Sequence, residues 1–304
     1  MDTLRINRRQ ILALAGAFGV AGVQSVAAQS TMPRRLIPGS NESLPVIGLG
    51  SSKVVQTIAA DGPAPLAAVL RQLIASGGSV VDTWPRNPSN DAAFGDVINA
   101  TDLRDALWIT TKIDQTGRDA GIAQFEATLR NYGRDQVDLV QIFSLTDVDS
   151  HWPSLRSFKD EGRARYIGVT VAETGLYEAL EAFLARETPD FVQINYSLTE
   201  RESETRFLPM LADRGIGVII NRPFMNGTYF QRLEGQALPE WTAEFDCTSL
   251  AQFSLKYIIA NPNLSCVLTE TSNPDHMAEN AQTAFGPLPD AAARQRMREF
   301  IDTH

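Results

Sequence analysis

The 304-residue sequence has little sulfur and little basic charge. It contains only two cysteines, Cys247 and Cys266, so a disulfide-dense scaffold is excluded, although a single bridge is not. Both lie among apolar neighbours, and we expect buried free thiols. The 27 Lys and Arg residues are outnumbered by 36 Asp and Glu residues. The resulting formal charge of −9 argues against nucleic acid or an anionic membrane as the main partner.

Long apolar runs are also scarce, and the N-terminal one is too short and too weakly apolar for a typical membrane span. A basic start precedes a Gly- and Ala-rich run from Ile11 to Val26, which small residues follow. This layout is typical of a cleaved secretory signal. The pair Arg8-Arg9 resembles a twin-arginine export signal, and we expect residues 1–29 to be that signal. The expected location is therefore periplasmic or secreted, with an uncleaved anchor as the alternative.

The rest of the chain, residues 30–304, is predicted to be one domain that alternates short apolar strands with amphipathic helices. A hairpin is expected first, turning at Pro38-Gly39. Strands that are apolar throughout are typical of a parallel sheet buried on both faces. Eight of them predict a (β/α)8 TIM barrel. A doubly wound sheet is the alternative, weakened because no Gly-x-Gly-x-x-Gly follows an early strand. The predicted strands are 46–49, 79–82, 107–111, 137–142, 164–169, 191–194, 217–220 and 265–269.

Polar residues follow several of these strands, at the barrel end where such folds carry their chemistry. One strand ends on Asp82 and the next on Lys112, so the carboxylate and the ammonium are expected to pair. Such a pair either serves catalysis or only closes the barrel mouth. Gln193 stands near the same rim and could bind a carboxamide or satisfy the backbone.

Taken together, the motifs resemble the aldo-keto reductase family over nearly the whole domain. The matching segments, in order, are "LPVIGLG", "VVDT" followed by Gly95, "ITTK", "VDLVQI", "GRARYIGVT", "FVQINYS", "VIINRPF" and "TSNPDHMAEN". The resemblance implies NADPH, or NADH, bound across the C-terminal rim without a Rossmann motif. It also implies hydride transfer to a small-molecule carbonyl substrate.

The family's catalytic set is Asp, Tyr, Lys and His, and only two of the four match. Asp82 and Lys112 match the Asp and the Lys, whereas Asn87 stands at the Tyr position and Phe143 at the His position. An asparagine amide cannot act as a proton-donating acid near neutral pH. We therefore expect a degenerate catalytic set, and we expect that restoring the Tyr and His raises carbonyl reduction.

The cofactor positions that the resemblance implies are also only partly kept. Gln193 matches an amide contact, and Thr170 stands where a Ser-Asn pair is usual. Asn221, followed by Arg222, replaces the aromatic residue that stacks on nicotinamide, and His276 replaces an Arg that reads the 2′-phosphate. At the far end, the residues expected to contact phosphate and adenine are Thr271, Ser272, Asn273, Glu279 and Asn280. The first three are also good N-cap residues for a helix that starts at Pro274.

Trp84 and Arg86 are predicted to line the substrate mouth. His151 and Tyr196 are two further candidates for the missing polar group, although each is more commonly a solvated or packed residue. Two hypotheses stay open: an exported oxidoreductase with weak or altered carbonyl reduction, and a non-catalytic barrel that binds a dinucleotide, another small ligand or a protein partner.

Overall fold

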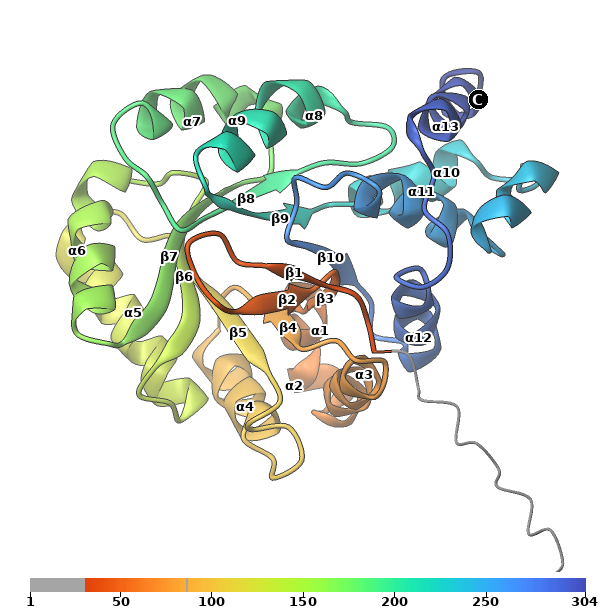
Figure 1. The fold of residues 1–304 in the computed structure, drawn as a ribbon. Helices are drawn as coiled ribbons and strands as arrows, with labels where there is room; N and C mark the ends of the chain where they lie inside the picture. Colours follow the sequence, from red (N-terminus) through yellow and green to blue (C-terminus); the bar gives the residue numbers. More distant parts are fainter. Residues whose placement is uncertain (1–30, 86) are drawn as a thin grey trace, which may run out of the picture. The chain divides into compact units, whose positions relative to one another are not determined.

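A computed structural model describes residues 31–85 and 87–304; the predicted export segment and Arg86 lie outside these residues. Eight parallel strands close a barrel in the order β10-β3-β4-β5-β6-β7-β8-β9 (Figure 1). The strands are β3 (Ile47–Gly50), β4 (Val80–Asp82), β5 (Trp108–Ile113), β6 (Val137–Phe143), β7 (Ala164–Val171), β8 (Phe191–Asn195), β9 (Gly217–Asn221) and β10 (Cys266–Glu270). The predicted TIM barrel is confirmed, and the doubly wound alternative is wrong because the sheet closes on itself.

Each predicted strand corresponds to one barrel strand, with bounds that differ by at most two residues. The agreement follows from burial, because strands such as β5 and β8 are buried at every position. A strand enclosed by helices outside and side chains inside has no polar face, so its apolar run is easy to recognise.

The predicted hairpin pairs β1 (Arg34–Leu36) with β2 (Ser43–Pro45) and closes the N-terminal end of the barrel (Figure 1). Ile37 and Leu44 are buried there against Trp108, Phe191 and other residues from the beginnings of the barrel strands. This apolar plug leaves the C-terminal ends of the strands as the end that can hold a ligand.

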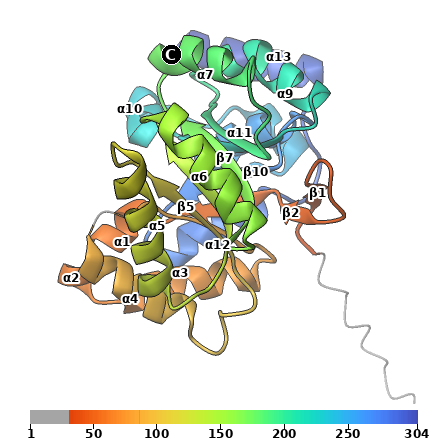
Figure 2. The same cartoon turned by 90° about the vertical axis from the view of Figure 1, so that its left-hand side faces the viewer.

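Helices cover the outside of the barrel, as the side view in Figure 2 shows for α5 and α6. They are α1 (Ser52–Gln56), α2 (Ile58–Asp61), α3 (Ala64–Ala75), α4 (Pro88–Ile98), α5 (Arg118–Tyr132), α6 (Val148–Asp160), α7 (Tyr177–Leu184), α8 (Glu202–Arg206), α9 (Leu208–Asp213), α10 (Thr228–Arg232), α11 (Leu250–Ile259), α12 (Pro274–Gln282) and α13 (Ala291–Asp302). Short 3-10 turns are η1 (Thr174–Leu176), η2 (Met225–Gly227) and η3 (Glu240–Phe245). Gly95 lets α4 approach α5, since a Cβ there would lie 1.9 Å from the Asn131 carbonyl oxygen.

One carboxylate on α8, that of Glu204, contributes to holding the C-terminal helix α13. Glu204 accepts hydrogen bonds from the hydroxyls of Tyr196 (2.7 Å) and Tyr257 (2.6 Å). Arg294 and Arg298, both on α13, lie 3.0 and 3.8 Å from the same side chain. Burial raises the pKa of Glu204, but the two hydroxyls and the two guanidinium groups outweigh it and hold that pKa below its usual value.

The predicted state of the cysteines is confirmed, since Cys247 and Cys266 are buried and unbridged. Within residues 31–85 and 87–304, no helix combines the length and apolarity needed to cross a membrane.

Candidate active site

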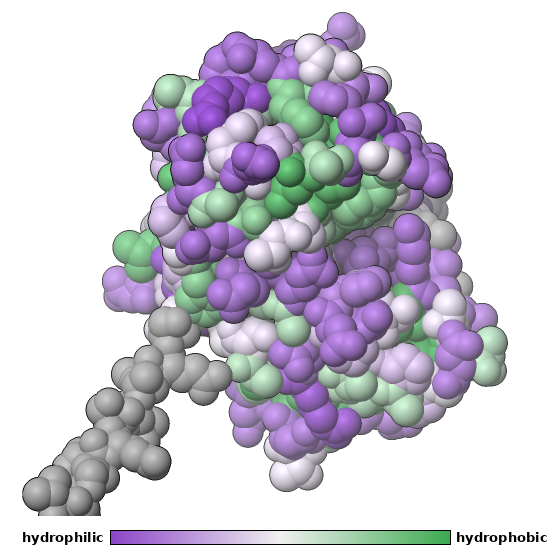
Figure 3. All heavy atoms as spheres, turned by 90° about the vertical axis from the view of Figure 1, so that its right-hand side faces the viewer, coloured by the Kyte–Doolittle hydropathy of each residue, from purple (hydrophilic) through white to green (hydrophobic). Residues whose placement is uncertain are grey.

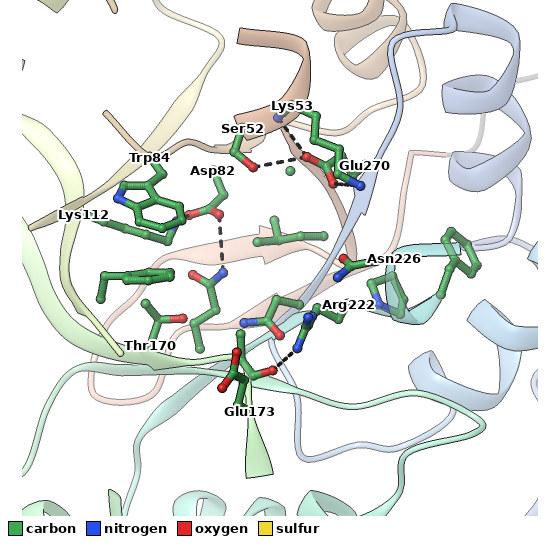
Figure 4. Close-up of a pocket in the computed structure, with 18 of the residues that line it drawn as sticks. Ser52, Lys53, Asp82, Trp84, Lys112, Thr170, Glu173, Arg222, Asn226 and Glu270 are labelled. Atoms are coloured by element: carbon green, nitrogen blue, oxygen red, sulfur yellow. Dashed lines mark hydrogen bonds and ion pairs between the residues drawn. The ribbon is translucent and has the colours of Figure 1, made fainter. Parts of the chain in front are cut away.

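The carboxyl ends of the strands surround a cavity of about 880 Å³ (Figure 4). Its floor carries Asp82 and Lys112, and its walls come from the segments after β3, β4, β6, β7 and β9 and from the end of β10. The opening is partly apolar, because Phe224 and the 40% exposed Phe230 line it. Figure 3 shows the face that carries α11 to α13, on which apolar surface gathers above a more polar region.

Asp82 and Lys112 form a buried ion pair on the cavity floor. The Lys112 Nζ lies 2.5 Å from Asp82 Oδ1 and donates a second hydrogen bond to the Thr83 carbonyl at 3.1 Å. Asp82 is 7% exposed and Lys112 is 5% exposed. The predicted pairing is therefore confirmed, and its register follows from parallel β4–β5 pairing, which sets Asp82 beside Thr110, two residues before Lys112.

An amide chain extends this pair across the barrel interior. Gln193 Nε2 lies 3.3 Å from Asp82 Oδ2, while Gln193 Oε1 accepts a 2.7 Å hydrogen bond from Gln141. Gln141 in turn donates to the Thr110 hydroxyl at 3.0 Å. The chain fixes the orientation of Asp82 from the side opposite the ammonium group.

An aromatic stack covers the floor beside Lys112. The rings of Trp84 and Phe143 have centroids 3.8 Å apart and planes inclined by 27°. The Trp84 Nε1–H donates to Asp114 at 2.9 Å, which holds the indole over the end of β6. Trp84 lines the cavity as predicted, and Phe143, at the position of the family His, makes this part of the site apolar.

Asn87, which the sequence resemblance assigns to the tyrosine position, is a helix cap. Its Oδ1 accepts hydrogen bonds from the backbone N–H groups of Ser89 (3.0 Å) and Asn90 (3.3 Å) at the start of α4. The residue is exposed, and it is not among the residues that line the cavity. In this structure the Asn87 amide is turned towards the helix, and the catalytic position assigned to residue 87 from the sequence stays a prediction.

Four of the predicted cofactor residues lie together in the cavity wall, namely Thr170, Gln193, Asn221 and Arg222. Asn221 Nδ2 donates to the Val171 carbonyl at 3.2 Å, while its buried Oδ1 has no hydrogen-bond partner among the residues that the structure describes. Arg222 has a left-handed backbone (φ 53°) and donates to the Ala172 carbonyl.

The other predicted cofactor residues lie at the start of α12 and beyond, outside the cavity lining. Asn273 is the N-cap of α12, and its side chain accepts from the Asp275 N–H at 2.8 Å. The Thr271 hydroxyl accepts from the Asn273 N–H, and Ser272 and His276 are exposed. Further along, Asn280 is buried and Glu279 is half-buried. The structure therefore confirms the predicted helix start, while the contacts of these residues with a nucleotide stay a prediction.

The two alternative donors are both directed away from the cavity. His151 lies within α6, fully buried, with Nε2 2.6 Å from the Gln115 carbonyl oxygen. The hydroxyl of Tyr196 contacts Glu204 and Arg294. Among the described residues that line the cavity, none is a tyrosine or a histidine. The described chain also brings no three His, Cys, Asp or Glu side chains together as a metal site.

Several cavity residues were missed in the sequence, most importantly Ser52, Lys53, Glu173 and Glu270. Glu270 is the last residue of β10, so the strand-end rule that selected Asp82 also applies to it. Lys53 stands three residues after β3 in the same way. Lys53 and Glu270 are 217 positions apart in the sequence, and no local sequence pattern predicts that they pair.

The fold and the site define a TIM barrel with its chemistry on the C-terminal face. Residues 46–297 match the model of the Aldo/keto reductase family, and the chain belongs to that family. A structure of an aldo-keto reductase from Klebsiella pneumoniae in complex with NADPH superposes with a TM-score of 0.72 at 19% identity, over 89% of this chain and 96% of that one. An aldo-keto reductase from Bacillus halodurans, in its holo form, also gives a TM-score of 0.72 at 19% identity, over 88% and 96% of the two chains.

Among sequence relatives, L-galactose dehydrogenase of Arabidopsis thaliana is 27% identical over 177 residues. The match covers 48% of this chain and 53% of that protein, so it spans about half the length of the relative.

Proposed function

We propose that this protein binds NADPH in the 880 Å³ cavity and is an oxidoreductase with weak or altered reduction of small carbonyl compounds. The observation that carries the proposal is the buried Asp82–Lys112 pair, joined to Gln193 on the cavity floor. A buried charge pair at the strand ends of a TIM barrel is the usual setting for its chemistry. Family membership and the NADPH complex of the Klebsiella pneumoniae relative point to the same cofactor class.

The cavity residues fit the nicotinamide end of such a cofactor. A carboxamide has both donors and an acceptor, and Asn221 Oδ1 is an acceptor without a partner. Gln193 and Thr170 supply further polar groups beside it, and Arg222 supplies a cation. These four side chains would hold and orient the cofactor.

When bound, NADPH would supply a hydride to the substrate carbonyl carbon. Lys112 Nζ would donate a hydrogen bond to the carbonyl oxygen, while Asp82 and the Thr83 carbonyl hold the ammonium in place, and the proton that completes the alcohol would come from Lys112, which solvent then reprotonates, or from solvent directly. No phenol or imidazole lines the cavity among the described residues, so a positioned neutral acid is missing. General acid catalysis contributes a factor of about 10²–10⁴ to the rate. We expect turnover to be lower by a factor of that size than in an enzyme that has a positioned acid.

A non-catalytic, ligand-binding barrel is the second candidate, and one specific observation favours it. The Trp84–Phe143 stack lies beside Lys112, which is only 5% exposed. Asp82 and the Thr83 carbonyl already bind this ammonium group, so little of it is open to a carbonyl oxygen. The same cavity would then bind a dinucleotide or another small ligand without turnover.

Fluorescence titration of the purified domain with NADPH and NADH tests the proposal, followed by turnover on a broad panel of aldehydes and ketones. Saturable binding with slow turnover supports the enzyme. Binding with no turnover on any carbonyl supports the non-catalytic barrel. If neither nucleotide binds, the cofactor assignment is wrong for both.

We also propose export through residues 1–29, with a periplasmic or secreted location, on the strength of the Arg8-Arg9 pair and the apolar run behind it. Twin-arginine export moves folded proteins and so suits a domain that is loaded with a cofactor first. Replacing both arginines by lysine in the full chain should retain it in the cytoplasm. Unchanged fractionation of that variant would contradict the proposal.

A further inference from the structure

Glu270 makes a three-point contact at one edge of the cavity, where β10 lies beside β3. Its Oε1 accepts hydrogen bonds from the Ser52 hydroxyl at 3.1 Å and from the Lys53 backbone N–H at 2.9 Å. Its Oε2 lies 3.3 Å from the Lys53 ammonium. These contacts, which we call the Glu270 clamp, join the end of β10 to the start of α1 (Figure 4).

In the clamp, Glu270 neutralises the positive charge of Lys53, which could otherwise attract an anionic ligand. Three cations line the described cavity, namely Lys53, Lys112 and Arg222. Lys112 is paired with Asp82, and Lys53 is paired with Glu270. Arg222 donates to a backbone carbonyl, so among the three it alone has no ion pair with a carboxylate.

Negative charge lines the same space. Glu173 and Glu270 stand on opposite sides of the cavity in Figure 4, with Glu173 near Arg222 and Glu270 near Lys53. The side chain of Glu270 is 30% exposed and that of Lys53 is 65% exposed, so the pair lies at the solvent-accessible edge of the cavity, where solvent and salt partly screen both charges. A ligand that extends from the floor towards the start of α12 passes Glu270, because Glu270 lines the cavity and Thr271 follows it directly.

We propose that Glu270 is a specificity-determining residue that occupies the position of a ligand phosphate beside Lys53, and that the clamp must open before a dinucleotide binds. The inference rests on the proposed function, since it concerns the phosphates of the same dinucleotide. A carboxylate and a phosphate are both acceptors for an ammonium group and for a backbone N–H. Binding therefore replaces the Glu270 carboxylate at Lys53 with a ligand phosphate. The strength of the contacts of Glu270 with Ser52 and Lys53 then sets the affinity for the nucleotide.

The variant Glu270→Gln separates charge from shape, because glutamine keeps the size and an acceptor oxygen. It should bind NADPH about tenfold more tightly, since the repulsion between the carboxylate and the phosphates is removed and Lys53 is released. Glu173→Gln is the matched control: it removes the same charge from the same cavity without touching the clamp, and it should change the dissociation constant far less. Adding Lys53→Met to Glu270→Gln should cancel most of the gain.

A second readout does not use nucleotide. Amide hydrogen exchange at Lys53 should be faster in Glu270→Gln than in the unchanged protein, because a neutral amide is a weaker acceptor than a carboxylate. In Glu173→Gln the exchange should stay the same.

The outcomes distinguish this inference from the proposed function. If the unchanged protein binds NADPH and Glu270→Gln binds it no more tightly, the clamp does not set affinity and the inference fails alone. If neither the protein nor Glu270→Gln binds NADPH or NADH, the proposed function fails and the inference fails with it. Tighter binding in Glu270→Gln, lost again with Lys53→Met, supports both.

Discussion

The indole of Trp84 lies against the phenyl ring of Phe143, with centroids 3.8 Å apart, over the end of β6 and beside Lys112. Two apolar rings thus occupy the part of the site where the family resemblance implies a polar histidine. The stack joins a loop residue to a strand-end residue, and the Trp84–Asp114 hydrogen bond fixes it from a third element. Trp84, Phe143 and Lys112 all line the same cavity.

Restoring the family residues should work best when the stack is also removed. Asn87→Tyr with Phe143→His should raise NADPH-dependent carbonyl reduction, and adding Trp84→Ala should raise it further, because the bulky indole that stacks on residue 143 is removed from the cavity lining. Steady-state NADPH oxidation with an aldehyde panel measures both variants. A triple variant that folds, binds cofactor and stays inert would show that pocket shape, not the missing acid, limits turnover.

Neutralising only one member of the Asp82–Lys112 pair should strongly lower the free energy of unfolding. Asp82→Asn leaves the 5% exposed ammonium without its counter-charge and should lower the free energy of unfolding by about 3–5 kcal/mol. Asp82→Asn with Lys112→Met should recover much of this loss, because both charges are gone. The exposed Arg71–Asp102 pair is the control, and Asp102→Asn should leave urea unfolding unchanged. Equal effects at the two sites would contradict the buried pairing.

Asn87 should behave as a helix cap. Asn87→Ala should lower the free energy of unfolding by about 1 kcal/mol, because the Ser89 and Asn90 N–H groups lose their acceptor. Asn87→Asp should retain stability, since aspartate caps equally well, and both variants should keep the NADPH dissociation constant. Weaker NADPH binding at unchanged stability would instead place Asn87 in the binding site.

The attachment of α13 should weaken in acid. The pKa of Glu204 is lower in the folded chain than in the unfolded chain, so its ionised form stabilises the fold. That contribution is present above the unfolded-state pKa and is lost as the pH falls through the folded-state pKa. Glu204→Gln should therefore destabilise the protein near neutral pH, by about 2 kcal/mol for lost charged hydrogen bonds, and by progressively less in acid. Urea unfolding across this pH range measures the difference, and a gap independent of pH would contradict the assignment.

The sequence was sufficient for the barrel and for its ionic floor. Strands buried on both faces carry unbroken apolar runs, and eight such runs between amphipathic helices leave few other folds. Because parallel strands all end on the same side, Asp82 and Lys112 could be placed together without coordinates. The helix start at Asn273-Pro274 was predictable for a local reason, since capping involves only neighbouring residues.

Side-chain direction and long-range contacts were decided only by the tertiary structure. The sequence resemblance assigns Asn87 to a catalytic position, and in the structure its amide turns to the backbone of α4. Trp84 and Phe143 stack across 59 positions of sequence, and Glu270 contacts Lys53 across 217. No local pattern encodes such pairs, because they depend on barrel closure, which brings β10 beside β3 and the loops after β4 and β6 to one rim. The sequence thus determines which residues could react. The closed fold determines which groups surround them, such as the Trp84–Phe143 stack and the Glu270–Lys53 pair.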